Sequence, residues 1–232
     1  MFKARVIYEV YDGNELVGRE VSLDPFVRNW VEIMRGLLNP NYEASFYDIA
    51  TRQTIRTKIL HPLDLVSPLG IMDVMAEKGM SDYGIVVGNA KGSKDFGRYA
   101  LVSAMVHQDK VFEYGAMEDL GFDVVAGNFV WRIRRTFDNV GTSPVDIWES
   151  AVYALFYHYR PGGRPLEVAL IMIALDVRDT AFRLEAGQRG VVTYLSTPCN
   201  GFHIRSLPTL PPHSLSKRLS TPCNGFTTRM VF

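Results

Sequence analysis

The stretch FDVVAGNFVWRIRRTFDNVG, residues 122–141, decides the fold class. Within it, Trp131 and Ile133 alternate with Arg132 and Arg134. Side chains of a β-strand point alternately to opposite faces, so this spacing places the apolar residues on one face and the arginines on the other. The stretch therefore predicts a strand that buries one face of a sheet and leaves the other face to solvent.

Strand-like runs continue on both sides of this stretch, separated by turn signals such as Asp12-Gly13. The run at 145–159 also fits an amphipathic helix, but its β-branched and aromatic residues favour a strand. For residues 61–81 a loop and a short helix both remain open. The expected strands cover residues 3–11, 16–23, 44–60 (a hairpin or meander), 82–90, 97–107, 111–120, 122–141, 145–159, 166–177, 181–188 and 190–195.

One helix is expected, near the start of the chain. Asp24 can cap its first turn and Pro25 suits the first helical position, while Asn39-Pro40 ends it. Between these signals, apolar residues recur at helical spacing and predict a packing face. They are Phe26, Trp30, Ile33, Met34, Leu37 and Leu38. The predicted helix covers about residues 25–38.

Together these patterns predict an all-β protein with a single N-terminal helix, built as a β-sandwich of immunoglobulin-like or jelly-roll-like type. We expect three parts. Residues 1–80 hold the first hairpin, the helix and a connecting segment, and residues 81–195 form the β-sandwich domain. Residues 196–232, rich in proline and serine, form an extended basic C-terminal arm.

The charge of the chain is uneven although its formal net charge is zero. Residues 186–232 carry five basic side chains and no acidic one, so the rest of the chain holds 20 basic and 25 acidic side chains. The basic arm can therefore attract the acidic body, either within one chain or between copies. A net charge of zero gives no bulk attraction to nucleic acid or to an anionic membrane.

An identical octapeptide, LSTPCNGF, occupies residues 195–202 and 219–226 and contains both cysteines of the chain, Cys199 and Cys223. Pro-Cys-Asn-Gly is typical of a tight turn, because Asn and Gly tolerate a positive φ. The two cysteines are a candidate disulfide in an oxidising setting, within one chain or between two, and free thiols in a reducing one. The sequence alone leaves these states open.

No motif predicts catalysis, a metal or a cofactor. GNAKGSK at 88–94 faintly resembles a phosphate-binding loop, but it lacks the required Gly-Lys-Ser/Thr ending. The five histidines are not paired with other metal ligands at the usual spacings. The start of the chain lacks the apolar region of a signal peptide, and the apolar run at 167–177 is too short to span a bilayer. We therefore expect no enzyme, no cofactor and no membrane span.

A series of short motifs runs through the first four fifths or so of the chain. It includes SDYGIVVGNA (81–90), FEYGA (112–116), RTFDNVG (135–141) and LEAGQRGVVTYL (184–195). The series resembles uncharacterised structural proteins of tailed phages and environmental viral sequences, and its second half also resembles immunoglobulin-like repeat domains of surface proteins. The chain departs from the phage pattern by its added arm at 196–232 and by LIMIALDV at 170–177, which lacks an expected arginine.

The resemblance implies a structural subunit of a viral particle or an extracellular filament, which assembles through β-sheet packing and exchange of the C-terminal arm. Its partners would be other copies of itself and other virion proteins, without direct contact to nucleic acid, and its location the virion or the extracellular space. The alternative is a cell-surface or phage binding module of immunoglobulin type that recognises carbohydrate or protein. The expected assembly contacts are Phe26, Trp30, Trp131, Trp148, Phe226 and Phe232.

Overall fold

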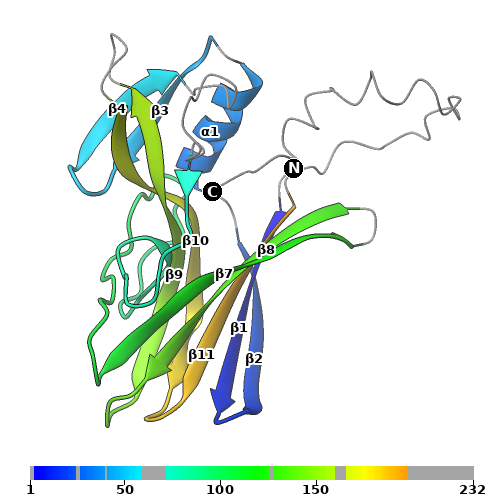
Figure 1. Ribbon diagram of the computed structural model, residues 1–232, viewed down its shortest axis with the longest axis vertical. Coiled ribbons are helices and arrows are strands. Elements are labelled where there is room, and N and C mark those ends of the chain that lie inside the picture. Colours follow the sequence, from blue (N-terminus) through cyan, green and yellow to red (C-terminus); the bar gives the residue numbers. More distant parts are fainter. Residues whose placement is uncertain are drawn as a thin grey trace, which may run out of the picture.

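The computed structural model describes residues 3–24, 27–39, 41–58, 72–125, 128–159 and 166–197. Antiparallel strands dominate this part of the chain, which confirms the all-β class (Figure 1). The elements are β1 (Lys3–Asp12), β2 (Glu15–Asp24), α1 (Arg28–Leu38), β3 (Glu43–Asp48), β4 (Gln53–Lys58), β5 (Met72–Asp73), β6 (Gly84–Gly88), β7 (Phe112–Val125), β8 (Asn128–Asn139), β9 (Val145–Tyr159), β10 (Leu166–Leu184) and β11 (Arg189–Thr197).

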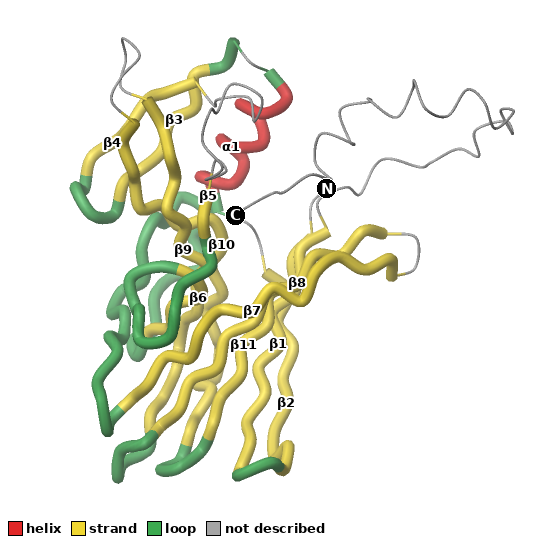
Figure 2. Tube along the Cα trace, viewed as in Figure 1, coloured by secondary structure: helices red, strands yellow, loops and turns green. Residues whose placement is uncertain are grey.

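Five strands form the larger sheet, in the order β2–β1–β11–β8–β7. All neighbouring strands are antiparallel, and Val6 of β1 lies opposite Tyr194 of β11. The first and the last described strands are therefore direct neighbours (Figure 2). Because of this pairing, the expected domain boundary at residue 80 separates segments that share one sheet.

The second sheet contains β10 and β9, and the short strands β5 and β6 pair with the other side of β9. β10 is one strand of 19 residues, whereas the sequence predicts separate strands at 166–177 and 181–188. The predicted break was wrong, because an irregularity between Val177 and Phe182 takes up the extra residues before pairing with β9 resumes. The strand predicted at 145–159 is confirmed as β9.

The two sheets share one hydrophobic core. Tyr8 of the larger sheet packs against Phe182 of the second sheet, with their ring centroids 5.1 Å apart. The far face of the second sheet is also covered, since Val27 and Leu101 cluster with Met172 of β10. Burial on both faces explains why Ile171–Leu175 of β10 are continuously apolar, whereas a strand covered on one face alternates.

Both hairpins predicted in the N-terminal part are confirmed. β1 and β2 join at Asp12-Gly13, where Gly13 has a φ of 59° that suits glycine. β3 and β4 pair along their full length. Just after β3, the Ile49 N–H donates to the Leu170 carbonyl at 2.8 Å. This bond docks the β3–β4 hairpin on β10, at the same end of the molecule as α1 (Figure 1).

The helix α1 begins later than predicted, at Arg28. Asp24 does not cap it, because this residue continues β2, where it lies opposite Ala4. No side chain caps the first turn. The end at Asn39 is as predicted. Trp30 and Ile33 of the predicted packing face are buried where α1 packs on β3 and β10, and Met34 is half-buried. Phe26 lies outside the described residues, as do the side chains of Leu37 and Leu38.

The strand predicted at 97–107 was wrong, because these residues form an irregular segment with one isolated bridge to β6. Arg98 in this segment holds the buried carboxylate of Glu149 with N–O distances of 2.6 and 3.0 Å. Glu149 also accepts hydrogen bonds from the backbone N–H groups of Gly92 and Val102. The Glu149 carboxylate thus holds this segment in an irregular conformation. For this reason the alternating sequence of residues 97–107 does not pair as a strand.

Candidate functional site

The larger sheet has two edge strands, β7 and β2, and among the described residues only β1 pairs with β2 (Figure 1). Its residues from Glu15 to Leu23 are exposed, apart from the half-buried Gly18 and Ser22. Leu23 is 74% exposed and Val21 57%. The exposed large apolar residues of this strand, which we call the β2 apolar edge, are Leu16, Val17, Val21 and Leu23.

The pairing register with β1 shows which way the side chains of β2 face. Val21 lies opposite the half-buried Ile7, and Leu23 points to the same side two residues later. Glu20 lies opposite the buried Tyr8 and so faces the second sheet. Val21 and Leu23 therefore face away from the core, and packing within one copy does not account for them.

A polar cluster ties β2 to the second sheet. The Ser22 hydroxyl donates to Asp176 at 2.6 Å, and the Tyr8 hydroxyl donates to the other oxygen of the same carboxylate at 2.5 Å. Glu20 forms an ion pair with Arg178, whose guanidinium lies 4.4 Å from the centre of the Tyr8 ring. Burial is the main cause that raises the pKa of Tyr8 well above its ordinary value, so this hydroxyl stays protonated and can donate.

On β7, β8 and β11, the outer face of the same sheet is covered by ion pairs between neighbouring strands. The Arg134 guanidinium of β8 lies 2.8 Å from Glu118 of β7, and that of Arg189 of β11 lies 2.6 Å from Asp138 of β8. Such exposed pairs add little stability, but they keep this surface polar. β7, β8 and β11 thus present charge on the face where β2 presents valine and leucine.

A second group of exposed apolar side chains lies on the irregular segment between β6 and β7. Tyr99 of this segment packs against Tyr47 of β3, with ring centroids 3.7 Å apart. The segment lacks the regular row of backbone donors and acceptors that an edge strand presents. Its exposed members are Phe96, Tyr99, Val102, Val106 and Val111.

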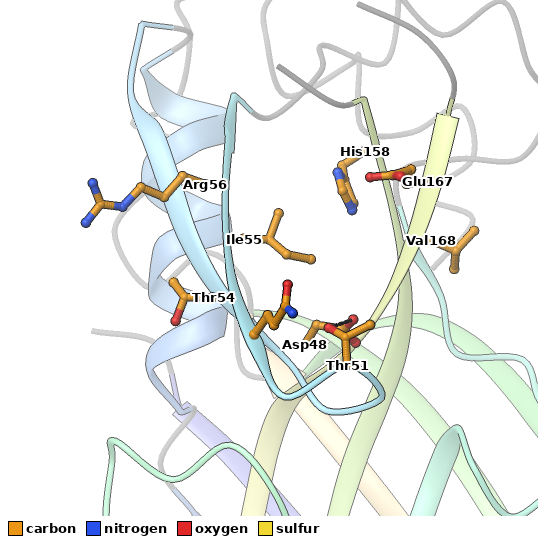
Figure 3. Close-up of a pocket in the computed structure, with 9 residues that line it drawn as sticks. Asp48, Thr51, Thr54, Ile55, Arg56, His158, Glu167 and Val168 are labelled. Atoms are coloured by element: carbon orange, nitrogen blue, oxygen red, sulfur yellow. Dashed lines mark hydrogen bonds between the residues drawn. The ribbon is translucent and has the colours of Figure 1, made fainter. Parts of the chain in front are cut away.

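A pocket of about 860 Å³ lies between the β3–β4 hairpin and the ends of β9 and β10 (Figure 3). Ile55 points into it from β4 and His158 from β9 (Figure 3). His158 is 5% exposed, and its buried Nδ1 has no hydrogen-bond partner among the described residues. The Asp48 carboxylate is already engaged, by the Thr51 hydroxyl at 2.6 Å and the Leu170 N–H at 3.0 Å. This His158 nitrogen is itself buried, so the pocket presents mainly the side chains of Thr51, Gln53 and Glu167 as polar groups.

Arg135 of β8, in the larger sheet, is a fully buried cation. Its guanidinium lies 4.7 Å from the centre of the Tyr114 ring. Burial lowers the pKa of Arg135 to about 10, which leaves the side chain charged at neutral pH. It donates to backbone carbonyls at 2.8–3.1 Å, among them those of Gly115, Tyr83 and Ile85.

The structure places the predicted assembly residues in several environments. Trp30 and Trp131 are buried in the core of the chain itself, so they pack within one copy and offer little surface to another. Trp148 is half-buried, with the Lys91 amine 5.5 Å from the centre of its ring. Outside the described residues lie Phe26, Phe226, Phe232, Cys199 and Cys223.

Val21 and Leu23 were not predicted as contact residues. Their signal was the short alternation of Val21 and Leu23 with Ser22 and Asp24 at the end of β2. Alternation alone does not show whether the apolar face of a strand meets the core or the solvent. The structure supplies that information through the edge position of β2.

Comparison with protein-family models, curated proteins and solved structures finds no match to this chain. In the described part of the chain, no three histidine, cysteine or acidic side chains come together in a way that could hold a metal ion. No helix among the described residues has the length and apolar character needed to cross a bilayer.

Proposed function

We propose that the protein is a structural subunit that assembles with copies of itself in a viral particle or an extracellular filament. We also propose that its two sheets form a β-sandwich of immunoglobulin-like or jelly-roll-like type, which the shared core supports. The β2 apolar edge is the observation that carries the proposed assembly. The motif resemblance to phage structural proteins supports the viral setting.

An edge strand presents a row of unpaired backbone N–H and C=O groups in addition to its side chains. Monomeric proteins usually blunt such an edge with charged side chains, proline, a bulge or a short strand. β2 is ten residues long and has no proline or lysine, and its bulge near Val17 and its charged Arg19 precede the exposed Val21 and Leu23. Fully burying a valine or leucine side chain is worth about 1.5–3 kcal/mol, and covering a side chain that is already partly buried contributes a fraction of this before the cost of association is subtracted. Contact between copies along β2 would satisfy the backbone edge and bury these side chains together.

Replacement of Val21 by lysine tests the proposal, because a charge on this exposed position opposes strand pairing. We expect the unmodified protein to associate as its concentration rises, measured by size-exclusion chromatography with light scattering, and to form ordered particles or filaments in negative-stain images. Val21→Lys should weaken this association by about tenfold or more.

Val168→Lys is the matched control, since Val168 is 52% exposed on β10 at the pocket end of the molecule. This variant should associate as the unmodified protein does. The proposal is contradicted if the unmodified protein remains monomeric at high concentration, or if the two lysine variants behave alike.

A second candidate function is a binding module of immunoglobulin type that recognises carbohydrate or protein, and the pocket in Figure 3 favours it. His158 lines this pocket together with polar side chains such as Thr51 and Glu167, which can form hydrogen bonds with a polar ligand. Glycan and peptide arrays probed with the full chain and with His158→Ala test this idea. Binding that the substitution abolishes supports it, whereas unchanged binding or no binding contradicts it.

A further inference from the structure

We propose that residues 226–232, FTTRMVF, of one copy add to β2 of another copy as an antiparallel strand. This inference rests on the proposed assembly function and deepens it, because it names the segment that covers the β2 apolar edge. The position of β11, the side chains of FTTRMVF and the charge of both segments support it, and the length of the connection allows it.

The last described strand ends close to the free edge of the sheet. Thr197 of β11 lies opposite Lys3, and the next residue of β1, Ala4, lies opposite Asp24 at the end of β2. Neighbouring strands lie about 4.8 Å apart, so the chain leaves the sheet about 10 Å from β2. Thirty-five residues of the sequence follow Thr197, and they include FTTRMVF.

Three of the four side chains on one face of residues 226–232 in a strand are apolar, which suits the exposed apolar side chains of β2. In an antiparallel alignment with Phe226 opposite Leu23, Thr228 falls opposite Val21. The apolar edge of β2 would then meet an aromatic ring and a β-branched side chain on the same face. In a strand, one side of the segment would carry Phe226, Thr228, Met230 and Phe232, and the other would carry Thr227, Arg229 and Val231.

Charge favours the same alignment, because it places Arg229 opposite Glu20. The Glu20 side chain is 52% exposed in addition to its ion pair with Arg178, so it can accept a second cation. Residues 3–24 hold three basic and five acidic side chains, whereas residues 198–232 hold four basic ones and no acidic one. Opposite net charges attract the segment to this hairpin.

The length of the connection allows residues 226–232 to reach another copy. Twenty-eight residues separate Thr197 from Phe226, and fully extended they reach up to about 95 Å. The same connection also spans the distance of about 10 Å to β2 of its own chain. The choice of another copy therefore rests on the proposed assembly, and crosslinking tests it against addition within one chain.

Engineered cysteines test the alignment in the full chain. Cys199→Ser and Cys223→Ser first remove the native thiols. One chain then carries Leu23→Cys and a second carries Phe226→Cys, and the two are mixed under mild oxidation. Directly opposed side chains have Cβ atoms about 4.5–5.5 Å apart, close enough for a disulfide after a small adjustment. We expect a crosslinked dimer on a non-reducing gel, with one chain of each kind by mass spectrometry.

The matched control replaces Leu23→Cys by Arg19→Cys, which lies on the same outer face four residues away. This control should crosslink to Phe226→Cys at least about fivefold less, since the offset is about 13 Å along the strand. Equal yields overturn the alignment. A disulfide that forms only inside a single chain carrying both Leu23→Cys and Phe226→Cys overturns the exchange between copies.

Thr228→Pro distinguishes failure of this inference from failure of the proposed function. Proline removes an N–H from the added strand, so we expect it to weaken association about tenfold, as Val21→Lys does. If Val21→Lys disrupts association and Thr228→Pro leaves it unchanged, the added strand is wrong while assembly through β2 stands. If the unmodified protein never associates and no crosslink forms, both proposals are overturned.

Discussion

β2 and β8 are amphipathic strands of the same sheet, yet they lie in opposite environments. β8 lies between β11 and β7 and buries Ile133 and Phe137, whereas β2 lies at the edge and leaves Val21 and Leu23 exposed. Both sequences contain an alternation of apolar and polar residues, at 21–24 in β2 and at 131–134 in β8. The comparison teaches that alternation predicts a strand, while the order of strands in the sheet determines whether its apolar face is covered.

The largest expected effect comes from the core side of β8. Arg135→Ala removes the donor for several buried carbonyls, so it should lower the free energy of unfolding by about 3–5 kcal/mol. Arg134→Ala, one residue earlier on the exposed face, should lower it by about 1 kcal/mol or less. Urea denaturation of both variants measures the difference, and equal losses would show that the two faces of β8 do not differ as described.

Alkaline pH tests the core as a whole. Burial raises the pKa of Tyr8 and Tyr114 and, to about 12, that of Tyr153, whereas in the unfolded chain these tyrosines ionise near pH 10. The stability they contribute is present below pH 10 and is lost as the pH rises above it. Arg135 opposes this trend, because its pKa of about 10 lies below its unfolded value.

The balance of three tyrosines against one arginine gives a loss of about 3 kcal/mol in unfolding free energy between pH 8 and pH 11. Urea denaturation at several pH values measures this loss. Tyr153→Phe should reduce it by about 1 kcal/mol, since one titrating group is removed. A stability that is constant up to pH 11 would contradict the burial of these hydroxyls.

An intermediate effect is expected where the core meets the edge strand. Tyr8→Phe removes a donor from the buried Asp176 carboxylate and should lower the unfolding free energy by about 1–2 kcal/mol. Ser22→Ala, which removes the donor on the β2 side of the same carboxylate, should lower it by about 1 kcal/mol. Thermal unfolding measures both, and a larger loss for Ser22→Ala would mean that β2 is held more firmly than its exposure suggests.

The smallest effect on stability is expected at the edge itself. Val21→Thr should change the unfolding free energy of the dilute protein by about 0.5 kcal/mol or less, because Val21 is exposed. Val192→Thr makes the same chemical change on a fully buried residue of β11 and should lower it by about 1–3 kcal/mol. Similar losses in the two variants, measured in urea, would remove the distinction between edge and core.

Local sequence signals predicted most elements and failed where a distant partner intervenes. The turn at Asp12-Gly13 and the strand β9 follow from local preferences. Asp24 did not cap the helix because Ala4 pairs with it in the sheet. Residues 97–107 did not form a strand because Glu149 binds the Arg98 side chain and accepts a hydrogen bond from the Val102 N–H. These partners lie 20 to about 50 residues away, beyond the reach of any local pattern.

The candidate site shows the same division. The short alternation at 21–24 and the charge of the arm at 196–232 were visible in the sequence. The exposure of Val21 and Leu23 was not, because it depends on β2 having a partner on one side only. The buried Arg135 was also missed, although the alternation places it on the same face as Trp131 and Ile133, because an arginine is seldom found inside a core.

The amino-acid sequence by itself determined the alternating strands, the hairpin turn, the single helix and the uneven charge, because these depend on local sterics and on composition. Only the tertiary structure decided that β1 lies beside β11, that Arg135 is inside and that β2 is left at the edge. The physical reason is that pairing between distant strands depends on the joint burial of one core, to which every strand contributes and which no single segment specifies.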